Sequence, residues 1–204
     1  MIGPLLRSSG FTLIEIMIVL AIIVGVLTIA APKMFSTASA MRTAIRKLAI
    51  TSREVRNNAR MYNMTTRLVL DMKKEGAHSY WVESANGEVT LLSEEQQKEL
   101  DRLTELQREG EAPKNEFKPE TRVVRNPVSL PKSLYFESVE TSSSSEAVKE
   151  GKAYIHFFAK GFSEDAAIHI TDRKTLNWTI VVNPLTGRAD VFERNISLKE
   201  VRGK

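Results

Sequence analysis

The apolar residues of this chain are concentrated in one run near its amino terminus. Between Phe11 and Ala31, Glu15 is the only ionisable residue, and Thr12 and Thr28 are the only other polar side chains. At about 1.5 Å per helical residue the run reaches roughly 31 Å, which matches the hydrocarbon core of a bilayer. The pattern therefore predicts a transmembrane helix over residues 11–31.

An amphipathic pattern follows this run directly. Apolar or small residues recur at spacings of three and four, which predicts a second helical half over residues 32–63. Its predicted buried stripe is Met41, Ile45, Leu48, Ser52, Val55, Ala59 and Tyr62. Pro32 lacks a backbone donor, so we expect it to kink the long helix between its two halves.

Short β-rich runs separated by turn residues make up most of residues 64–204. A charged, helix-prone stretch followed by a proline-rich stretch interrupts them at about 93–131, which indicates an insertion. The predicted fold is α+β, with a long N-terminal helix packed on a mostly antiparallel, β-sandwich-like head. The predicted strands are 67–72, 79–83, 88–92, 134–140, 153–158, 166–171, 178–182 and 189–192.

Composition narrows the chemistry that the chain can perform. It contains no cysteine and carries a net charge of +4, so disulfides, thiolate catalysis and cysteine zinc sites are excluded. His78, His156 and His169 are widely separated, without the spacing of a metal site, and no nucleophile elbow or glycine-rich phosphate loop occurs. We expect no catalytic residue, no metal and no cofactor, and therefore no enzyme.

Residues Arg7 to Glu15, in the order RSSGFTLIE, resemble the processing motif of type IV pilins and pseudopilins. The shared features are a short polar leader, glycine before the cut, an aromatic residue after it, and glutamate fifth in the mature chain. The resemblance implies a leader at residues 1–10 that a membrane-embedded prepilin peptidase removes between Gly10 and Phe11. It also implies that the same peptidase methylates the new amino terminus at Phe11.

Glu15 has a physical role in this interpretation. A carboxylate inside a membrane segment costs on the order of 2.5 to 3.5 kcal/mol by insertion scales, so it requires a partner. Cleavage creates a positive charge at Phe11, and the ammonium of one subunit can neutralise Glu15 of an adjoining subunit. We expect Glu15 to act in assembly; the simpler alternative is a carboxylate that extends toward the membrane surface.

Four later blocks resemble the GspH/FimT group of minor pseudopilins: residues 53–71, 158–163, 167–170 and 178–188. The resemblance implies a β-sandwich-like head over 64–204 and a place near the tip of the type II secretion pseudopilus. The implied partners are prepilin peptidase, other pseudopilins in a hetero-oligomeric fibre, inner-membrane lipid and secreted substrates. The implied location is the inner membrane, with a single span and the C-terminal domain in the periplasm, and the pseudopilus after assembly. The insertion at 93–131 departs from a minimal member.

Two alternatives stay open. One is a conventional signal peptide cut after Ala40, followed by a secreted β-domain. The other is a minor type IV pilin for DNA uptake or adhesion. Its support is a basic ridge on the predicted helix, with basic residues of the C-terminal tail, although a solvated helix flank is the simpler interpretation. The ridge, our candidate contact surface, consists of Arg42, Arg46, Arg53, Arg56 and Arg60.

The mature amino terminus separates the first alternative from the pilin interpretation. We predict that protein purified from its native host begins at an N-methylated Phe11, because the glycine before it is the peptidase's cleavage signal. Mass spectrometry of the amino-terminal peptide measures this directly. A chain that begins at Met41 instead would support the conventional signal peptide.

Overall fold

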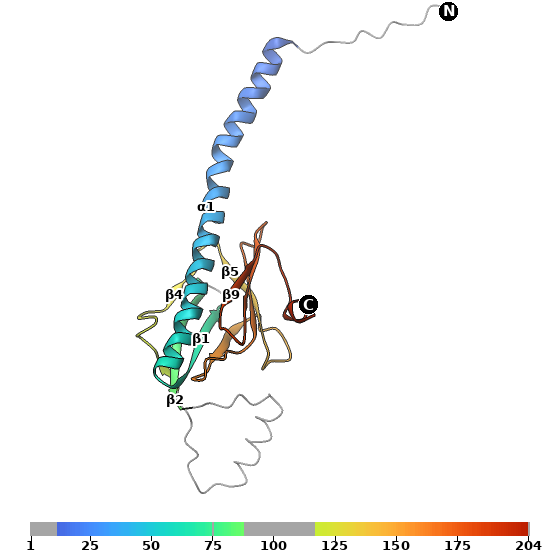
Figure 1. Cartoon of the computed structure of the whole chain (residues 1–204). Coiled ribbons are helices and arrows are strands. Elements are labelled where there is room, and N and C mark those ends of the chain that lie inside the picture. The colour runs from blue at the N-terminus through green and yellow to red at the C-terminus, as the bar shows by residue number, and fades with distance from the viewer. Residues whose placement is uncertain (1–11, 75, 88–116, 204) are drawn as a thin grey trace, which may run out of the picture. The chain divides into compact units, whose positions relative to one another are not determined.

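The computed structural model describes residues 12–74, 76–87 and 117–203, without the side chains of residues 27–36. The chain forms two compact units, Met1–Ser39 and Ala40–Lys204, which we treat separately. Helix α1 (Leu13–Met61) contributes residues to both, and its helical backbone continues through Pro32 (Figure 1). The kink at Pro32 stays a prediction, and the leader at 1–10 lies outside the described residues.

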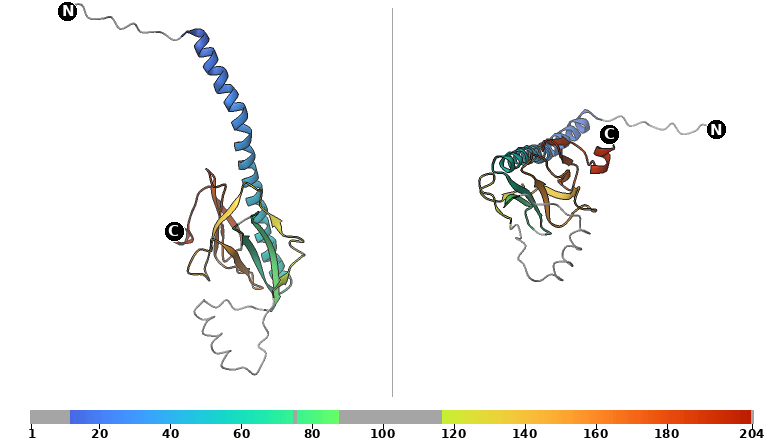
Figure 2. Two further views of the ribbon diagram at one scale, coloured as in Figure 1. Left: turned by 180° about the vertical axis from the view of Figure 1, so that it is seen from behind. Right: turned by 60° about the horizontal axis from the view of Figure 1, so that its bottom comes forward.

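Two antiparallel sheets form the head (Figures 1 and 2). In the first, β1 (Met64–Met72) pairs with β2 (Ser79–Asn86) and with β6 (Gly151–Phe157). The second has the order β5-β7-β8-β9, with bounds Tyr135–Thr141, Ala166–Thr171, Asn177–Val182 and Ala189–Phe192. A short helix, α3 (Leu198–Arg202), follows. The predicted α+β class is confirmed.

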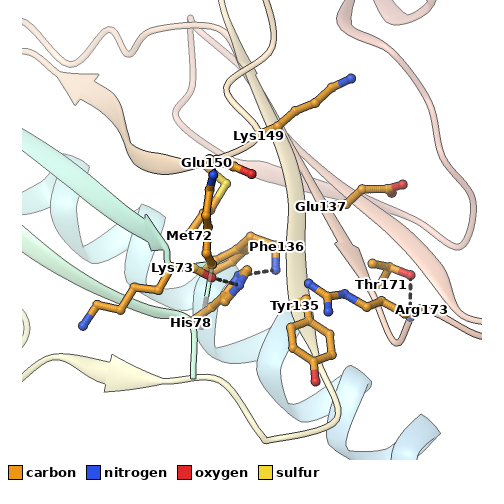
Figure 3. Close-up of a pocket in the computed structure, with 11 residues that line it drawn as sticks. Met72, Lys73, His78, Tyr135, Phe136, Glu137, Lys149, Glu150, Thr171 and Arg173 are labelled. Carbon is orange, nitrogen blue, oxygen red and sulfur yellow. Dashed lines mark hydrogen bonds and ion pairs between the residues drawn. The ribbon is translucent and has the colours of Figure 1, made fainter. Parts of the chain in front are cut away.

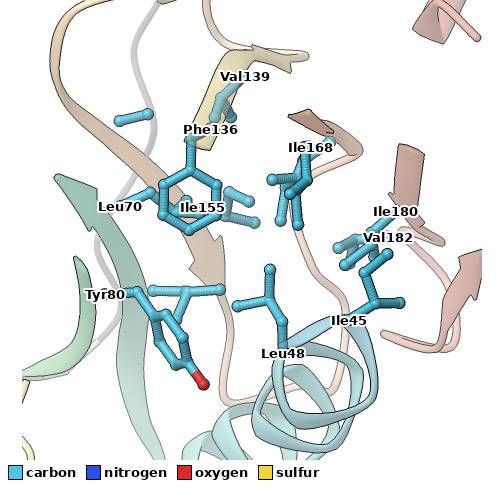
Figure 4. Packing of buried hydrophobic residues seen from close by; sticks show 14 of the residues in the cluster. Ile45, Leu48, Leu70, Tyr80, Phe136, Val139, Ile155, Ile168, Ile180 and Val182 are labelled. Atoms are coloured by element: carbon cyan, nitrogen blue, oxygen red, sulfur yellow. The ribbon is translucent and has the colours of Figure 1, made fainter. Parts of the chain in front are cut away.

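One face of α1 supplies the centre of the head's core. Leu48 and Ile45 point from the helix toward Ile155 of the first sheet and Ile180 of the second (Figure 4). The predicted stripe is confirmed from Met41 to Ala59, because all six of its members there are at most 3% exposed. It is wrong at Tyr62, which is 45% exposed. The helix has already ended at Met61, and Asn63 turns the chain with a φ of 50°.

Residues 117–131 correct the predicted insertion. They form β3 (Lys118–Pro119) and β4 (Val128–Ser129), which both pair with β2. Between these strands, the buried carboxylate of Glu120 accepts hydrogen bonds from Arg122 and from the hydroxyl of Ser84. This part of the segment therefore belongs to the first sheet. Predicted strand 88–92 lies outside the described residues; the other seven are present, with ends shifted by up to three residues.

His78 joins the start of β5 to the loop that follows β1 (Figure 3). Its Nδ1 accepts a hydrogen bond from the backbone N–H of Phe136 at 3.0 Å, so Nδ1 carries no proton. Its Nε2 lies 3.1 Å from the backbone oxygen of Lys73 and must donate to it. The ring is therefore neutral, and burial lowers its pKa below the ordinary value of 6.5.

This arrangement predicts a pH-dependent contribution to stability. Below about pH 6.5 the unfolded chain binds a proton at His78 that the folded chain does not bind, so the free energy of unfolding decreases as pH falls. His78→Leu should remove this contribution and destabilise the head by about 1–3 kcal/mol at pH 7.5, because it leaves a buried N–H and a backbone oxygen unpaired. Urea unfolding of both proteins between pH 5 and 8 measures the difference. Lys132→Ala changes an exposed residue and should keep the wild-type dependence of the unfolding free energy on pH. An unchanged pH dependence in His78→Leu would contradict the neutral ring.

Candidate assembly site

Thr12 and Glu15 form the amino-terminal cap of α1. The backbone N–H of Glu15 donates to the hydroxyl of Thr12 at 3.3 Å and to its backbone oxygen at 3.1 Å. This is the N-cap half of a capping box, in which threonine precedes glutamate by three residues. Sequence reasoning missed it, although the spacing is visible in residues 12–15. Glu15 therefore lies in the first helical turn, where the positive end of the helix dipole favours a negative charge.

The helix surface around Glu15 is apolar on every side. Every residue from Thr12 to Val26 is exposed in the single chain, and Leu13 is 79% and Met17 62% exposed. A helix that is apolar all round is stable only when other apolar groups cover it, as in lipid or in a bundle of helices. Glu15 is thus a lone carboxylate on a surface that requires an apolar environment.

Within the described part of the chain, no helix is long and apolar enough to count as a membrane span. The predicted span at 11–31 includes Phe11 and the side chains of 27–31, which lie outside that part. It stays a prediction, as do the cleavage site at Gly10 and the methylation site at Phe11.

The structure divides the five arginines of the predicted basic ridge into two groups. Arg56 and Arg60 pack on the head: Nε of Arg56 donates to the backbone oxygen of Gly161 at 2.8 Å. A Cβ on Gly161 would lie 2.9 Å from Cδ of Arg60, and a Cβ on Gly187 would overlap Cδ of Arg56. Arg56 therefore attaches α1 to the loop between β6 and β7, and the side chains of Arg56 and Arg60 lie closely against that loop and the β8–β9 turn.

The other three ridge arginines remain on an open surface. Arg42, Arg46 and Arg53 line a groove between α1 and the hairpin of β8 and β9, together with Arg188 of that hairpin. All three helix arginines are exposed. The ridge thus has two parts: Arg56 and Arg60 pack against the head as a clamp, and Arg42, Arg46 and Arg53 form an open surface.

The head also contains two histidine–carboxylate contacts, one buried and one partly buried, that sequence reasoning missed. Nδ1 of His156 lies 2.9 Å from Oε2 of Glu164, and Nε2 of His169 lies 3.2 Å from Oε1 of Glu140. Burial alone would raise the pKa of Glu164, but hydrogen bonds from His156 and Ser143 outweigh it and lower that pKa. Each pair joins residues at least eight positions apart, so no local spacing indicates them.

These pairs have the geometry of structural connections. The hydroxyl of Ser143 hydrogen-bonds to Glu164, whereas a nucleophilic serine requires a base such as an imidazole as its partner. Leu198 N–H donates to Oε2 of Glu140 at 2.8 Å, which attaches α3 to β5. Among the described residues, no group of three or more histidine, aspartate or glutamate side chains could hold a metal ion.

A polar cavity of about 360 Å³ lies next to His78 (Figure 3). Its charged lining residues are Lys73, Lys74, Lys149, Arg173, Glu137 and Glu150. Part of this charge is compensated, because Lys74 Nζ lies 3.0 Å from Oε2 of Glu150. The guanidinium of Arg173 stacks 3.9 Å from the ring centre of Tyr135.

Together these features describe a chain with an exposed apolar helical segment, a glutamate in its first turn, and an antiparallel head. The family described as "Prokaryotic N-terminal methylation motif" matches residues 5–31. This match supports a type IV pilin-like protein, either a pilin or a pseudopilin, and does not distinguish between them. No curated protein and no solved structure matches the chain.

The contact between Arg56 and Gly187 leads to a stability prediction. Gly187 has a φ of 60°, a conformation that costs a residue with a Cβ about 1–2 kcal/mol. Gly187→Ala should lower the free energy of unfolding by at least this amount, because the new methyl group also overlaps Arg56. Thermal and urea unfolding measure the change.

A second substitution separates the two causes. Arg56→Ala alone removes the hydrogen bond to Gly161; combined with Gly187→Ala it also removes the overlap, so the loss of stability in the double variant should be smaller than the sum of the two single losses. Gly203→Ala is the control, because Gly203 has a φ of −78°. Strict additivity of the two substitutions would show that the overlap has no effect on stability.

Proposed function

We propose that this chain is a minor pseudopilin of the GspH/FimT type, a structural subunit of the type II secretion pseudopilus that supports protein export across the outer membrane. One observation carries the proposal: Glu15 is a lone carboxylate in the first turn of a helix that is apolar on every side. In a fibre, the helices of neighbouring subunits cover that surface. The positively charged amino terminus of one subunit then neutralises Glu15 of the next.

Processing precedes assembly in this proposal. Prepilin peptidase removes residues 1–10 and methylates Phe11, and the segment 11–31 anchors the subunit in the inner membrane until it enters the fibre. The family match at 5–31 supports this step. The head faces the periplasm and contributes binding surfaces, and the protein has no catalytic activity, metal or cofactor.

The choice of the pseudopilus rests on the head. Its two antiparallel sheets and the closing hairpin of β8 and β9 are compatible with the GspH/FimT resemblance of residues 158–188. A minor type IV pilin would have the same motif and the same helix. Fractionation of the native host distinguishes the pseudopilin from the pilin. We expect to find the subunit in the cell envelope, where it can be cross-linked to other pseudopilins. Recovery of the subunit in pili sheared from the cell surface would instead support the pilin alternative.

The role of Glu15 is testable by substitution. We predict that Glu15→Ala and the isosteric Glu15→Gln leave leader removal intact and lower incorporation into fibres on the order of tenfold or more, the effect of losing about 1.4 kcal/mol per contact. Mass spectrometry measures processing, and cross-linking to neighbouring subunits measures incorporation. Glu54→Ala, which removes an exposed carboxylate of α1 in the head unit, should assemble normally. Normal incorporation of Glu15→Gln would overturn the charge-pairing mechanism.

A further inference from the structure

The groove between α1 and the β8–β9 hairpin lies wholly within the unit 40–204 and has a volume of about 520 Å³. Four arginines and Glu193 are its ionisable lining residues, so its net charge is +3. Trp178, from β8, packs partly on the core. Ile50, from α1, and Val191, from β9, also line the groove and are 51% and 41% exposed. We call these apolar lining residues the floor of the groove and its four arginines the rim.

Within the described part of the head, the charge of the groove has no internal compensation. The side chains of Arg42, Arg46, Arg53 and Arg188 make no ion pair or hydrogen bond with any other described residue. Other arginines of the head do: Arg67 pairs with Glu83 and Arg202 with Asp165. Four uncompensated arginines beside exposed apolar side chains favour a partner that supplies both carboxylates and apolar contacts.

The apolar floor decides between classes of anionic partner. A phosphate backbone gains from the arginines but has no use for exposed isoleucine and valine side chains. An acidic amphipathic segment of protein uses both features, because its apolar residues cover the floor while its carboxylates meet the rim. The geometry therefore favours a protein segment over nucleic acid.

This chain itself contains a segment of that composition. Residues 94–109, which lie outside the described part, include six acidic and three basic side chains, for a net charge of −3. Leu100, Leu103 and Leu106 recur among them at a spacing of three. The segment therefore matches the groove in the size and opposite sign of its charge, and it has the apolar residues that the floor requires.

The connection points of this segment favour a second copy as its source. Gly87, which precedes it, bridges to Met64 beside the end of α1, and Phe117, which follows it, leads into β3 of the first sheet. The groove lies along α1 at Arg42 to Arg53, about 12 to 28 Å from that end at 1.5 Å per residue. The hairpin of β8 and β9, in the second sheet, forms one wall of the groove. A segment that starts and ends beside the first sheet would have to cross its own head to reach this groove, whereas the segment of a neighbouring copy would not.

We propose that the groove of one copy binds residues 94–109 of a second copy. The contact rests on the assembly role proposed above and names a surface through which subunits meet. It does not depend on whether the fibre is a pseudopilus or a pilus. A failure of this contact leaves the Glu15 mechanism standing, because the two use different parts of the chain.

Exchange of charges between two variants tests the contact. The groove variant combines Arg46→Glu with Arg53→Glu, and the segment variant combines Glu95→Arg with Glu99→Arg. Arg46 and Arg53 are exposed residues of α1, and thermal unfolding checks that each variant keeps the head folded. Self-association of the full chain in detergent is measured by analytical ultracentrifugation at low salt and at 0.5 M salt, where exposed charges are screened.

The expected pattern has three parts. Wild-type chains associate at low salt and dissociate at high salt. Each variant alone associates about tenfold or more weakly, because like charges now face each other. An equimolar mixture regains the wild-type association, because each groove then meets a segment of opposite charge. The control, Lys132→Glu with Lys174→Glu, changes two exposed lysines outside the groove and should associate as the wild type does.

Three other results would overturn the proposal. In the first, the groove variant associates as strongly as the control. In the second, the mixture stays dissociated, but a single chain that carries all four substitutions associates as the wild type does. This result would mean that the groove binds the segment of its own chain. In the third, wild-type chains stay monomeric and bind a short DNA duplex through the same arginines, which assigns the groove to nucleic acid.

Discussion

Burial of one face of α1 against both sheets is the interaction on which the rest of the head depends. Met41, Leu48 and Val55 have no exposed surface, and they share one core with Ile155 of the first sheet and Ile168 of the second. Each such side chain contributes about 1.5–3 kcal/mol when it leaves water. The hydroxyl of Thr66 also donates to the backbone oxygen of Val55, in a buried hydrogen bond at 3.2 Å. The helix therefore holds the two sheets together, which leaves its other face available to partners.

That division of one helix into faces connects stability to function. Arg56 and Arg60 lie over Gly161 and Gly187, where only residues without a Cβ allow the loops to approach the helix so closely. Arg42, Arg46 and Arg53, on the same side of α1, line an open groove instead. The same residue type thus serves as a clamp near one end of the helix and as a contact surface further along it. The loop between β6 and β7 and the β8–β9 turn make the difference.

The sequence predicted most of the framework because the framework follows local rules. Alternating and helical periodicities indicated seven strands that the structure contains, and they indicated the stripe from Met41 to Ala59. They were wrong where a local pattern ran past a structural boundary: Tyr62 continues the helical spacing, but α1 has ended. They also missed β3 and β4, because two-residue strands have no periodicity to detect. These strands depend on pairing with β2 and on the carboxylate of Glu120.

Residues 5–31 indicate the kind of protein without any help from the rest of the chain. The match to the N-terminal methylation motif depends only on contiguous residues, so the sequence alone supports the type IV pilin-like character. The tertiary structure decided how the head is held together and where it can bind. His78 and Phe136, and His156 and Glu164, are distant along the chain and meet only when the sheets pack. Contacts of this kind arise from long-range packing, and no local pattern of residue types specifies them.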